Sequence, residues 1–399
     1  MKPATRTWLT TSVLAIGVAS LFSDACYELI IPLLPAFLAS LGGGAAALGL
    51  VEGLADALAA AFKLWGGQLA DHTKRRRAWT AAGYLGVGLF MPAIALATSI
   101  PMVTALRSLA WICRGFRSPI RDTLLVDDTD PKYVNRAFGF QRALDTVGAV
   151  IGPALAIAFI AMHMPLRQAI LFGLIPGVLA GAMYVFVKER PRTTPPRERL
   201  HIVLANLPSD FKRYLLSAGV FGLGNFSATL LVLVAMRAFA PYVTPAQAIV
   251  FATVLYLGHN ALYASLAFPA SVLSERIGTG RMLLAAFALF TSVGVLLAFG
   301  SMSIPVVIIT FVLAATGFAI LEPMEGTFAT ELLPAQRRGT GFGALAAING
   351  IGDFFSSATV GLLWQAAGPA VAFGSAGALC ALGLVLLAPL VRSRSMKGA

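Results

Sequence analysis

The sequence predicts an all-α integral membrane protein, with twelve transmembrane helices arranged as two pseudo-symmetric six-helix bundles. Hydrophobic residues make up 58% of the 399 residues and charged residues only 12%. A soluble globular domain has about 25% charged residues, so the chain is far too apolar for that class. Apolar segments long enough to cross about 30 Å of hydrocarbon recur along the whole chain. Short charged hinges also recur at matching points of its two halves.

The twelve expected spans are 11–38, 45–69, 79–97, 102–126, 138–161, 166–187, 214–238, 245–270, 282–299, 304–328, 341–365 and 370–391. Residues 1–187 then form the N-terminal bundle and residues 214–399 the C-terminal bundle. Residues 188–213 form a basic cytoplasmic linker, because prolines and five arginines break any membrane span there. Apolar residues at 200, 203, 204 and 207 predict a short amphipathic helix within this linker.

Basic residues are sorted by loop. With the N-terminus in the cytoplasm, 22 of the 30 Lys and Arg fall in cytoplasmic loops and tails and two fall outside. This asymmetry predicts a multi-pass protein of the plasma membrane (the inner membrane of a bacterium), with both termini cytoplasmic. The charges are spread over short loops without interleaved aromatic residues, so we expect the lipid bilayer as a partner and no nucleic acid. Three cysteines, scattered over expected helices, predict neither a disulfide nor a metal site, and we expect no cofactor.

Acidic residues occur inside the first two expected helices. Asp24 and Glu28 are four residues apart in the first helix and share a face. A carboxylate in a membrane helix costs about 2.5–3.5 kcal/mol on insertion scales, which points to a functional role with a partner or a wet cavity. In the second helix, Glu52, Asp56 and Lys63 favour two interpretations equally: an internal ion network or contact with a solute.

The hinge after the second helix is Gly67-x-Leu69-Ala70-Asp71-His72-x-x-Arg75-Arg76. It resembles the loop 2–3 signature of the major facilitator superfamily, with His72 in place of the usual Arg and Lys74 in place of the usual Gly. An echo occurs at residues 271–281, where Glu275 and Arg276 stand. Physically, the glycine allows close helix approach, Asp71 faces a helix N-terminus of the other half, and the arginines keep the loop in the cytoplasm.

The fourth expected helix carries an unusual stripe of arginines. Arg114, Arg117 and Arg121 follow one face, and such a stripe cannot face lipid. It either lines a central cavity or forms a structural ion network. Arg107 matches the arginine of the superfamily's helix 4 signature, but Ala110-Trp111 replaces the Gln-Gly that normally follows.

The next loop and helix resemble superfamily patterns as well. Asp127 and Arg136 belong to a turn whose counterpart lies in the second half, and the Phe-Gly pairs that follow the two turns are 204 residues apart. Gly148, Gly152 and Pro153 resemble the helix 5 signature of proton-exchanging exporters, although its closing Gly-Gly is missing. Small residues at every fourth position also let any two membrane helices pack closely.

The second half repeats the plan of the first half but not its ionisable residues. At the same offset, Glu52 becomes Tyr256 and Asp56 becomes Asn260. Glu322 and Glu325 are exceptions, because they are ionisable residues inside an expected helix of the second half. We expect a solute cavity lined by these two acids, by Tyr256, His259 and Asn260, and by the arginine stripe. For His259, a packed and hydrogen-bonded histidine is the alternative to a proton relay.

The superfamily resemblance implies alternating access powered by an ion gradient. We expect a monomer that exports a small solute in exchange for protons or another coupling ion. Asp24 is the candidate coupling carboxylate, because helix geometry puts it nearly level with Arg107, and Glu28 is a second acceptor. An importer or a metal- or siderophore-related carrier is the alternative within this class. A non-transporting membrane sensor is the alternative outside the class of transporters. The sequence contains no ATP-binding loop and no enzyme motif, so we expect neither ATP-driven transport nor an enzyme.

Overall fold

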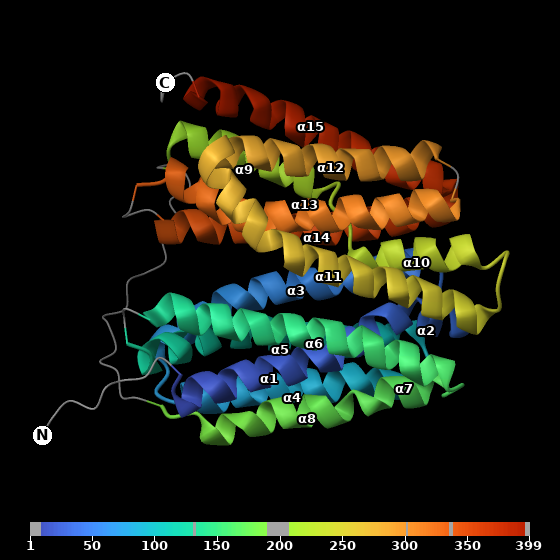
Figure 1. Ribbon diagram of the computed structural model, residues 1–399, viewed down its shortest axis with the longest axis horizontal. Helices are drawn as coiled ribbons and strands as arrows, with labels where there is room; N and C mark the ends of the chain where they lie inside the picture. The colour runs from blue at the N-terminus through green and yellow to red at the C-terminus, as the bar shows by residue number, and fades with distance from the viewer. Residues whose placement is uncertain (1–8, 131–132, 190–206, 301, 335–337, 396–399) are drawn as a thin grey trace, which may run out of the picture. The chain divides into compact units, whose positions relative to one another are not determined.

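The computed structural model describes residues 9–130, 133–189, 207–300, 302–334 and 338–395, and the regular secondary structure in these ranges is helical throughout (Figure 1). Nine helices of the described part are long and apolar enough to cross a membrane. The predicted all-α membrane fold class is therefore confirmed. The number of crossings, twelve, remains a prediction.

Helices follow one another with short connections. The first half contains α1 (Thr11–Ile30), a 3₁₀ turn at Ile31–Leu33, α2 (Leu34–Ser40), α3 (Ala45–His72), α4 (Arg76–Ala93), α5 (Ile100–Asp128), α6 (Val134–Ala161), α7 (Leu166–Phe172), α8 (Leu174–Ala182) and a 3₁₀ turn at Met183–Phe186. The second half contains α9 (Ser209–Gly222), α10 (Ala228–Phe239), α11 (Pro245–Ile277), α12 (Thr279–Phe299), α13 (Ile304–Leu332), α14 (Arg338–Ala367) and α15 (Pro369–Ser395).

Some expected spans consist of two helices. The first span changes to a 3₁₀ turn at Pro32, because proline lacks the N–H that a continuous α-helix requires. The seventh span is interrupted between α9 and α10, over residues 223–227. There, Ser356 of α14 donates to the carbonyl of Asn225 at 2.8 Å, and the Ser227 N–H donates to Ser357 Oγ at 3.1 Å. These serines satisfy backbone groups that the interruption leaves open.

The chain divides into two compact units. One contains residues 1–37 and 58–198, and the other contains residues 38–57 and 199–399. The boundary therefore falls inside α3, whose first turns group with the second unit. The division at residues 187 and 214 remains a prediction, and the amphipathic helix expected in the linker lies outside the described residues except for Leu207, which is buried.

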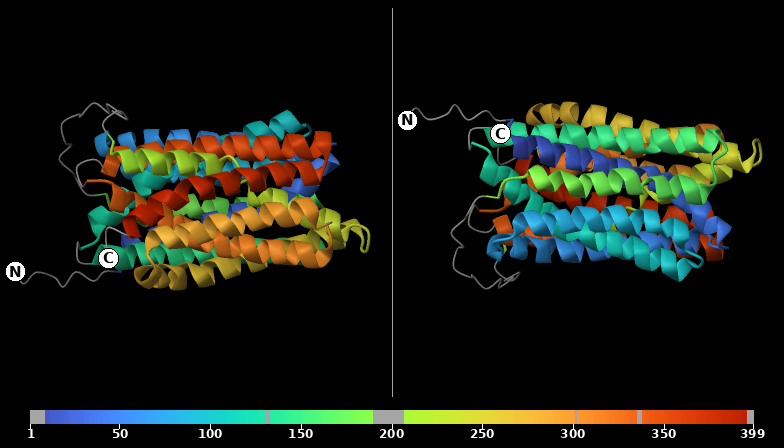
Figure 2. Two further views of the ribbon diagram at one scale, coloured as in Figure 1. Left: turned by 90° about the horizontal axis from the view of Figure 1, so that it is seen from above. Right: turned by 90° about the horizontal axis from the view of Figure 1, so that it is seen from below.

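In the first unit, α1 packs along α6 and also against α4 and α8 (Figures 1 and 2). The buried apolar core of this unit includes Val13, Ile16 and Leu124. Tyr84 of α4 and Tyr184, which follows α8, join this core with their ring centroids 5.0 Å apart. Both tyrosines are essentially buried, so polar groups lie within the apolar interior of this unit.

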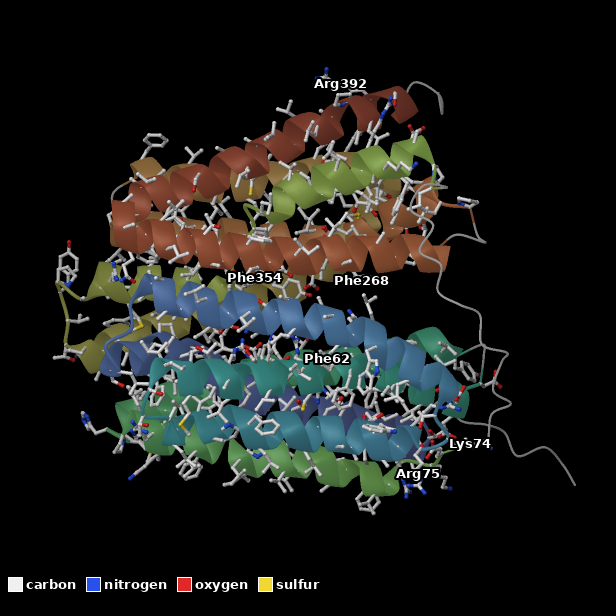
Figure 3. The ribbon with its side chains drawn as sticks, turned by 180° about the vertical axis from the view of Figure 1, so that it is seen from behind. Phe62, Lys74, Arg75, Phe268, Phe354 and Arg392 are labelled. Carbon is white, nitrogen blue, oxygen red and sulfur yellow. The ribbon has the colours of Figure 1, made fainter. Side chains whose placement is uncertain are left out.

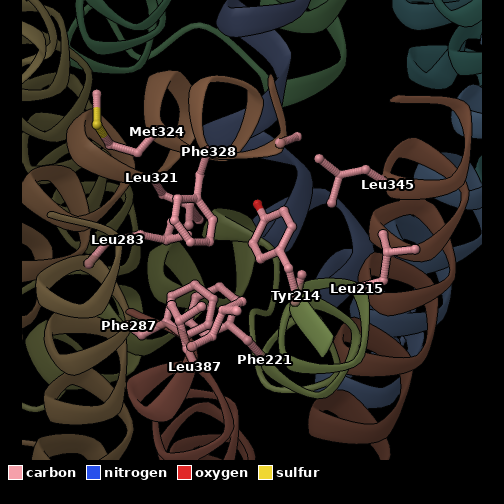
Figure 4. Packing of buried hydrophobic residues seen from close by; sticks show 14 of the residues in the cluster. Tyr214, Leu215, Phe221, Leu283, Phe287, Leu321, Met324, Phe328, Leu345 and Leu387 are labelled. Carbon is pink, nitrogen blue, oxygen red and sulfur yellow. The ribbon is translucent and has the colours of Figure 1, made fainter. Parts of the chain in front are cut away.

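In the second unit, aromatic residues from α9, α12 and α13 form the centre of a large apolar core (Figure 4). Phe221 stacks on Phe287 with ring centroids 3.8 Å apart, and the edge of Tyr214 meets Phe328 at 5.1 Å. The edge-to-face contact is one of the favoured geometries of aromatic pairs. This core fixes α9 against α12 and α13.

Candidate functional site

Two carboxylates of α1 lie against a glycine seam of α6. Asp24 is only 8% exposed, and Glu28 follows one turn later. A Cβ added at Gly148 would lie 2.9 Å from the Cβ of Asp24, and one added at Gly152 would lie 2.8 Å from the Cβ of Glu28. The lack of side chains on these glycines therefore lets α6 reach the part of α1 that carries both acids. A conformational role for this seam and for Pro153 remains a prediction.

The polar neighbours of Asp24 come from three helices. The hydroxyl of Tyr27, on the same helix, hydrogen bonds to its side chain, and Arg114 of α5, Asp145 of α6 and Glu28 lie within electrostatic range. Arg114 Nη2 also donates to the Tyr27 hydroxyl at 3.4 Å. Asp24 thus faces one guanidinium and two further carboxylates, so the net charge of this cluster depends on where protons are bound.

Trp111 organises the arginines beside this cluster. The Arg107 guanidinium lies 3.2 Å above its ring centroid, and that of Arg114 lies 5.1 Å away. The ring of Tyr27 meets Trp111 edge to face at 5.6 Å. The tryptophan occupies a position where the sequence departs from the superfamily signature, and only this departure could have singled it out. The pairing of Asp24 with Arg107 remains a prediction, and Arg114 is the arginine found near Asp24.

The other two arginines of the stripe have different surroundings. Arg121 Nε donates to Asp122 Oδ1 at 2.9 Å, which makes a neighbouring ion pair on the same helix. Arg117 is 3% exposed, and its Cζ lies 3.6 Å from the ring centroid of Tyr84. Arg121 therefore fits the structural-network interpretation of the stripe, whereas Arg117 makes a cation–π contact instead.

The predicted acids of α13 bind polar groups of neighbouring helices. The hydroxyl of Tyr263, on α11, donates to Glu322 Oε2. Asn349 Nδ2, on α14, donates to Glu325 Oε2 at 2.8 Å. The Tyr214 hydroxyl donates to the backbone carbonyl of Glu325 at 3.2 Å. These acids are thus held by neutral hydrogen-bond donors of the second unit.

His259 fits the packed and hydrogen-bonded interpretation. Its Nδ1 lies 3.4 Å from the carbonyl oxygen of Phe311, and its ring is parallel to that of Tyr256 at a centroid distance of 6.3 Å. The Phe318 ring meets it edge to face at 5.9 Å. His259 and Tyr256 are buried, and Asn260 is partly buried. Their assignment to a solute cavity remains a prediction.

One acid of the second unit was missed in the sequence analysis. Asp353 of α14 lies within electrostatic range of Asp56 of α3 and Glu325 of α13. In the same region, Ser227 Oγ donates to Glu52 Oε2 at 3.4 Å. The signal was present, because Asp353 is an acid inside the apolar span expected over 341–365. Its counterpart at the 204-residue offset is Ala149.

The end of the first unit that carries residues 73–77, which we call the hinge end, is held by a polar network. Arg76 pairs with Asp127 at the end of α5. The Arg76 N–H donates to Glu189 Oε1 at 2.5 Å, and Thr10 Oγ1 donates to Asp128 Oδ2 at 2.7 Å. The structure therefore brings two of the predicted gating residues together, Arg76 and Asp127. Arg76 is also bonded to Glu189, and Asp128, next to Asp127, is bonded to Thr10.

The close approach expected at Gly67 occurs one residue earlier. A Cβ at Gly67 would meet nothing within 4 Å, whereas a Cβ at Gly66 would lie 2.6 Å from Cα of Phe116 on α5. The expectation for Gly67 is corrected accordingly. A helix turns about 100° per residue, so adjacent glycines face different directions. The side chain of Asp71 lies outside the described part of the structure.

The remaining predicted hinge residues are exposed. Lys74 and Arg75 project at the hinge end (Figure 3). The Arg136 guanidinium lies 5.3 Å from the ring centroid of Tyr133. Glu275 and Arg276 lie at the end of α11, where Gly278 adopts a positive φ of 94° and forms the whole connection to α12. Glycine adopts such backbone angles without steric cost.

Among the described residues, no group of three or more His, Cys, Asp and Glu side chains is placed to hold a metal ion. Cys26, Cys113 and Cys380 are free thiols on three different helices. The polar groups that the structure does gather are guanidinium, carboxyl, hydroxyl and amide groups. Of these, the carboxyl groups can bind and release protons, and all four kinds of group can hydrogen bond to a polar solute.

Comparison with known proteins places these features in context. The sequence profile of the Major Facilitator Superfamily matches residues 16–260 and 214–398. An uncharacterised MFS-type transporter of Methanocaldococcus jannaschii is 29% identical over 358 residues, covering 90% of this chain and 89% of the relative. The multidrug resistance protein MdtG of Escherichia fergusonii is 27% identical over 323 residues, covering 76% of each chain.

Solved structures share the same fold. The nucleoside transporter NupG superposes with a TM-score of 0.76 at 11% identity, covering 96% of this chain and 99% of that protein. A bacterial homologue of the human lysosomal transporter Spinster superposes with a TM-score of 0.70 at 18% identity, covering 95% and 93% of the two chains. At these identities the likeness concerns the fold alone.

Proposed function

Because the chain belongs to the major facilitator superfamily, we propose that this multi-pass membrane transporter exports a small solute in exchange for protons. The observation that carries the proposal is the position of Asp24. This carboxyl group is buried on α1, beside Arg114, at a seam where glycines of α6 approach α1 closely. An acid in that position can bind a proton and can respond to a movement of either helix.

The coupling mechanism follows from the neighbours of Asp24. A carboxyl group changes its proton affinity when a guanidinium moves toward it or away from it. A conformational change that alters the distance between Asp24 and Arg114 would therefore bind or release a proton in step with the solute. Glu28, one turn away and against the same glycine seam, is the second acceptor. In this mechanism protonation biases one of two conformations.

Export is supported by two resemblances. The Gly148, Gly152 and Pro153 pattern of α6 is similar to the helix 5 signature of exporters, and one relative is named as a multidrug resistance protein.

The hinge end supplies a reversible contact for alternating access, because the ion pair between Arg76 and Asp127 joins the start of α4 to the end of α5. Breaking and forming such a pair is one way to bias two states.

Transport by purified protein in proteoliposomes tests the proposal. We would use three radiolabelled probes of different charge: the cation tetraphenylphosphonium, the dianion succinate and the neutral nucleoside uridine. With a pH difference imposed, wild-type protein is expected to concentrate a probe against its gradient. Asp24→Asn should abolish this accumulation while counterflow exchange of the probe continues, because exchange needs no net proton movement.

A matched control is Asp210→Asn, which removes a carboxylate that is more than a third exposed near the start of α9. This variant should accumulate the probe as the wild type does. If Asp24→Asn still concentrates a probe when a pH difference is imposed, Asp24 is not the coupling acid. Glu28, Glu322 and Glu325 would then be tested in the same way.

A second coupling ion is favoured by one specific observation. In the second unit, Asp353 lies within electrostatic range of both Asp56 and Glu325. Carboxyl groups inside a membrane protein mark ion or proton pathways, so Na⁺ is the alternative to the proton as the coupling ion. Replacing external sodium with choline separates the two cases: accumulation that depends on sodium, and not on the pH difference, would identify a sodium-coupled carrier.

A further inference from the structure

Arg117 is a buried cation whose hydrogen-bonding capacity is largely unused. Its side chain lies in the interior of the first unit, and Nε and Nη1 have no hydrogen-bond partner among the described residues. The guanidinium lies over the Tyr84 ring, with Cζ 3.6 Å from the ring centroid. A ring face contacts the flat side of the guanidinium and leaves the N–H groups at its edge available.

Several neutral groups surround Arg117 in the described part of the structure. Besides Tyr84, they include the thiols of Cys26 and Cys113 and the hydroxyl of Tyr184, each within electrostatic range. Arg76, by contrast, pairs with a carboxylate. Burying a charge without an opposite charge is costly, and buried N–H groups without acceptors add to that cost. The surroundings of Arg117 therefore call for an acceptor that carries negative charge.

A second unused polar group lies on the helix that faces Arg117. Ser23 of α1 is 1% exposed, and its Oγ has no hydrogen-bond partner among the described residues. One turn before it, Ser20 Oγ lies 3.1 Å from the Tyr84 hydroxyl. One turn after it, Cys26 lies within electrostatic range of Arg117. Ser23 thus sits between two residues of α1 that are directed at the Tyr84 and Arg117 region.

We infer that Arg117, Ser23 and Tyr84 form an oxyanion subsite that binds a carboxylate or phosphate group of the transported solute. The inference rests on the proposed transport function, and it adds the chemical class of the solute. Arginine is the side chain best suited to planar oxyanions, and a serine hydroxyl adds a neutral donor. Gln141 Nε2 donates to Ser20 Oγ at 3.0 Å, which holds the hydroxyl chain leading to Tyr84 in place.

The same chemistry could come from a free inorganic anion, so binding and transport are measured separately. Binding is measured as the saturable rise in melting temperature of purified protein in nanodiscs. The probes are sodium succinate and inorganic phosphate, each compared with sodium chloride at equal ionic strength. Wild-type protein should be stabilised by at least one oxyanion beyond the effect of chloride.

Arg117→Gln should weaken this binding by about tenfold to a hundredfold, because it removes a charged hydrogen-bond donor. Ser23→Ala should weaken it a few-fold without changing the charge. The control Arg142→Gln removes an arginine whose side chain is 62% exposed and should bind as the wild type does. Should Arg117→Gln fail to fold, Ser23→Ala alone decides: unchanged affinity in that variant overturns the inference.

Counterflow of radiolabelled succinate and phosphate then identifies the source of the anion. Counterflow of the anion that binds, lost in Arg117→Gln, supports a solute group in the subsite. Binding without counterflow of either anion would mean that the anion is bound but not transported and would overturn the assignment to the solute. The lack of oxyanion stabilisation in the wild type, or its persistence in Arg117→Gln, would also overturn the inference.

A failure of the oxyanion subsite can be distinguished from a failure of the proposed proton-coupled export. Should proton coupling be wrong, oxyanion binding would still depend on Arg117 while the pH difference would drive no accumulation. Should the subsite be wrong, Arg117→Gln would still accumulate tetraphenylphosphonium or uridine under a pH difference as the wild type does. The two failures therefore give different patterns.

Discussion

Gly148 of α6 lies against Asp24 of α1 so closely that a Cβ on the glycine would be 2.9 Å from the aspartate Cβ. The same added atom would overlap the carbonyl oxygen of Leu21. A buried acid of one helix and a missing side chain on its neighbour are thus parts of one contact. A change in the angle or position of α6 therefore changes the immediate surroundings of this carboxyl group.

Substitution of Gly148 with alanine should therefore lower the stability of the protein. Backbone atoms cannot move aside as a flexible side chain would, so Gly148→Ala should cost about 1–3 kcal/mol through overpacking. Gly139→Ala, on the same helix, is the matched control, because a Cβ there meets nothing within 4 Å. Thermal unfolding in detergent measures both, and equal melting temperatures for the two variants would argue against a close seam at Gly148.

A second pair of glycines tests the contact between α3 and α5. Gly66→Ala should destabilise the protein, because the new Cβ would lie 2.6 Å from Cα of Phe116, whereas Gly67→Ala should be neutral or slightly stabilising. The two variants differ only by one position in the chain. If the unfolding temperature falls in the Gly67 variant and not in the Gly66 variant, the close contact with α5 is at Gly67 and the prediction is wrong.

The ion pair at the hinge end should be important for turnover. Arg76→Gln and Asp127→Asn are each expected to reduce transport, and a double-mutant cycle on unfolding should give a coupling of about 1–3 kcal/mol, as for other contacting charges. The exchanged pair, with Asp at position 76 and Arg at 127, should restore part of the lost transport. Recovery should be incomplete, because Arg76 Nε also donates to the Thr73 carbonyl at 3.4 Å. Additive effects of the two single changes would show that the pair does not contribute.

The two charged hinges should differ in importance. Asp71→Asn should cut turnover strongly while leaving expression and probe affinity near normal, since the proposed role of Asp71 is to stabilise one conformation. Glu275→Gln should be milder, because Glu275 is exposed and its loop lacks the basic run of residues 74–77. Initial rates of probe transport, set against equilibrium binding, separate the two effects. Unchanged turnover in Asp71→Asn would remove the hinge role.

The sequence was sufficient to predict the membrane class and the positions of most helices, because long apolar segments and sorted charges depend on local composition. It also identified the acids of α1 and the glycines of α6. The contact between Asp24 and Gly148 was not predicted, since residues more than 100 positions apart meet only through tertiary packing. The neighbours of an acid depend on helix rotation, so the sequence did not single out Arg114 as a neighbour of Asp24, and the pairing of Asp24 with Arg107 remains a prediction.

Other differences have equally specific causes. Asp353 was missed as a site residue, and Trp111 entered the sequence analysis only as a departure from the superfamily signature. Gly66 and Gly67 are adjacent in the sequence, and only the rotation of α3 decides which of them faces α5. The interruption between α9 and α10 also depends on tertiary contacts, because Ser356 and Ser357 of α14 hydrogen bond to the backbone there.

This interruption sets an energetic limit on how the second unit can deform. Water is absent from hydrocarbon, so a backbone carbonyl or N–H that loses its partner there is left without a substitute, at a cost of several kcal/mol per group. A movement that pulled α14 away from Asn225 and Ser227 would lose two such hydrogen bonds at once. Movements in which α9, α10 and α14 shift together keep these hydrogen bonds and therefore cost less free energy. Sliding of α14 along the interrupted helix breaks them and costs more.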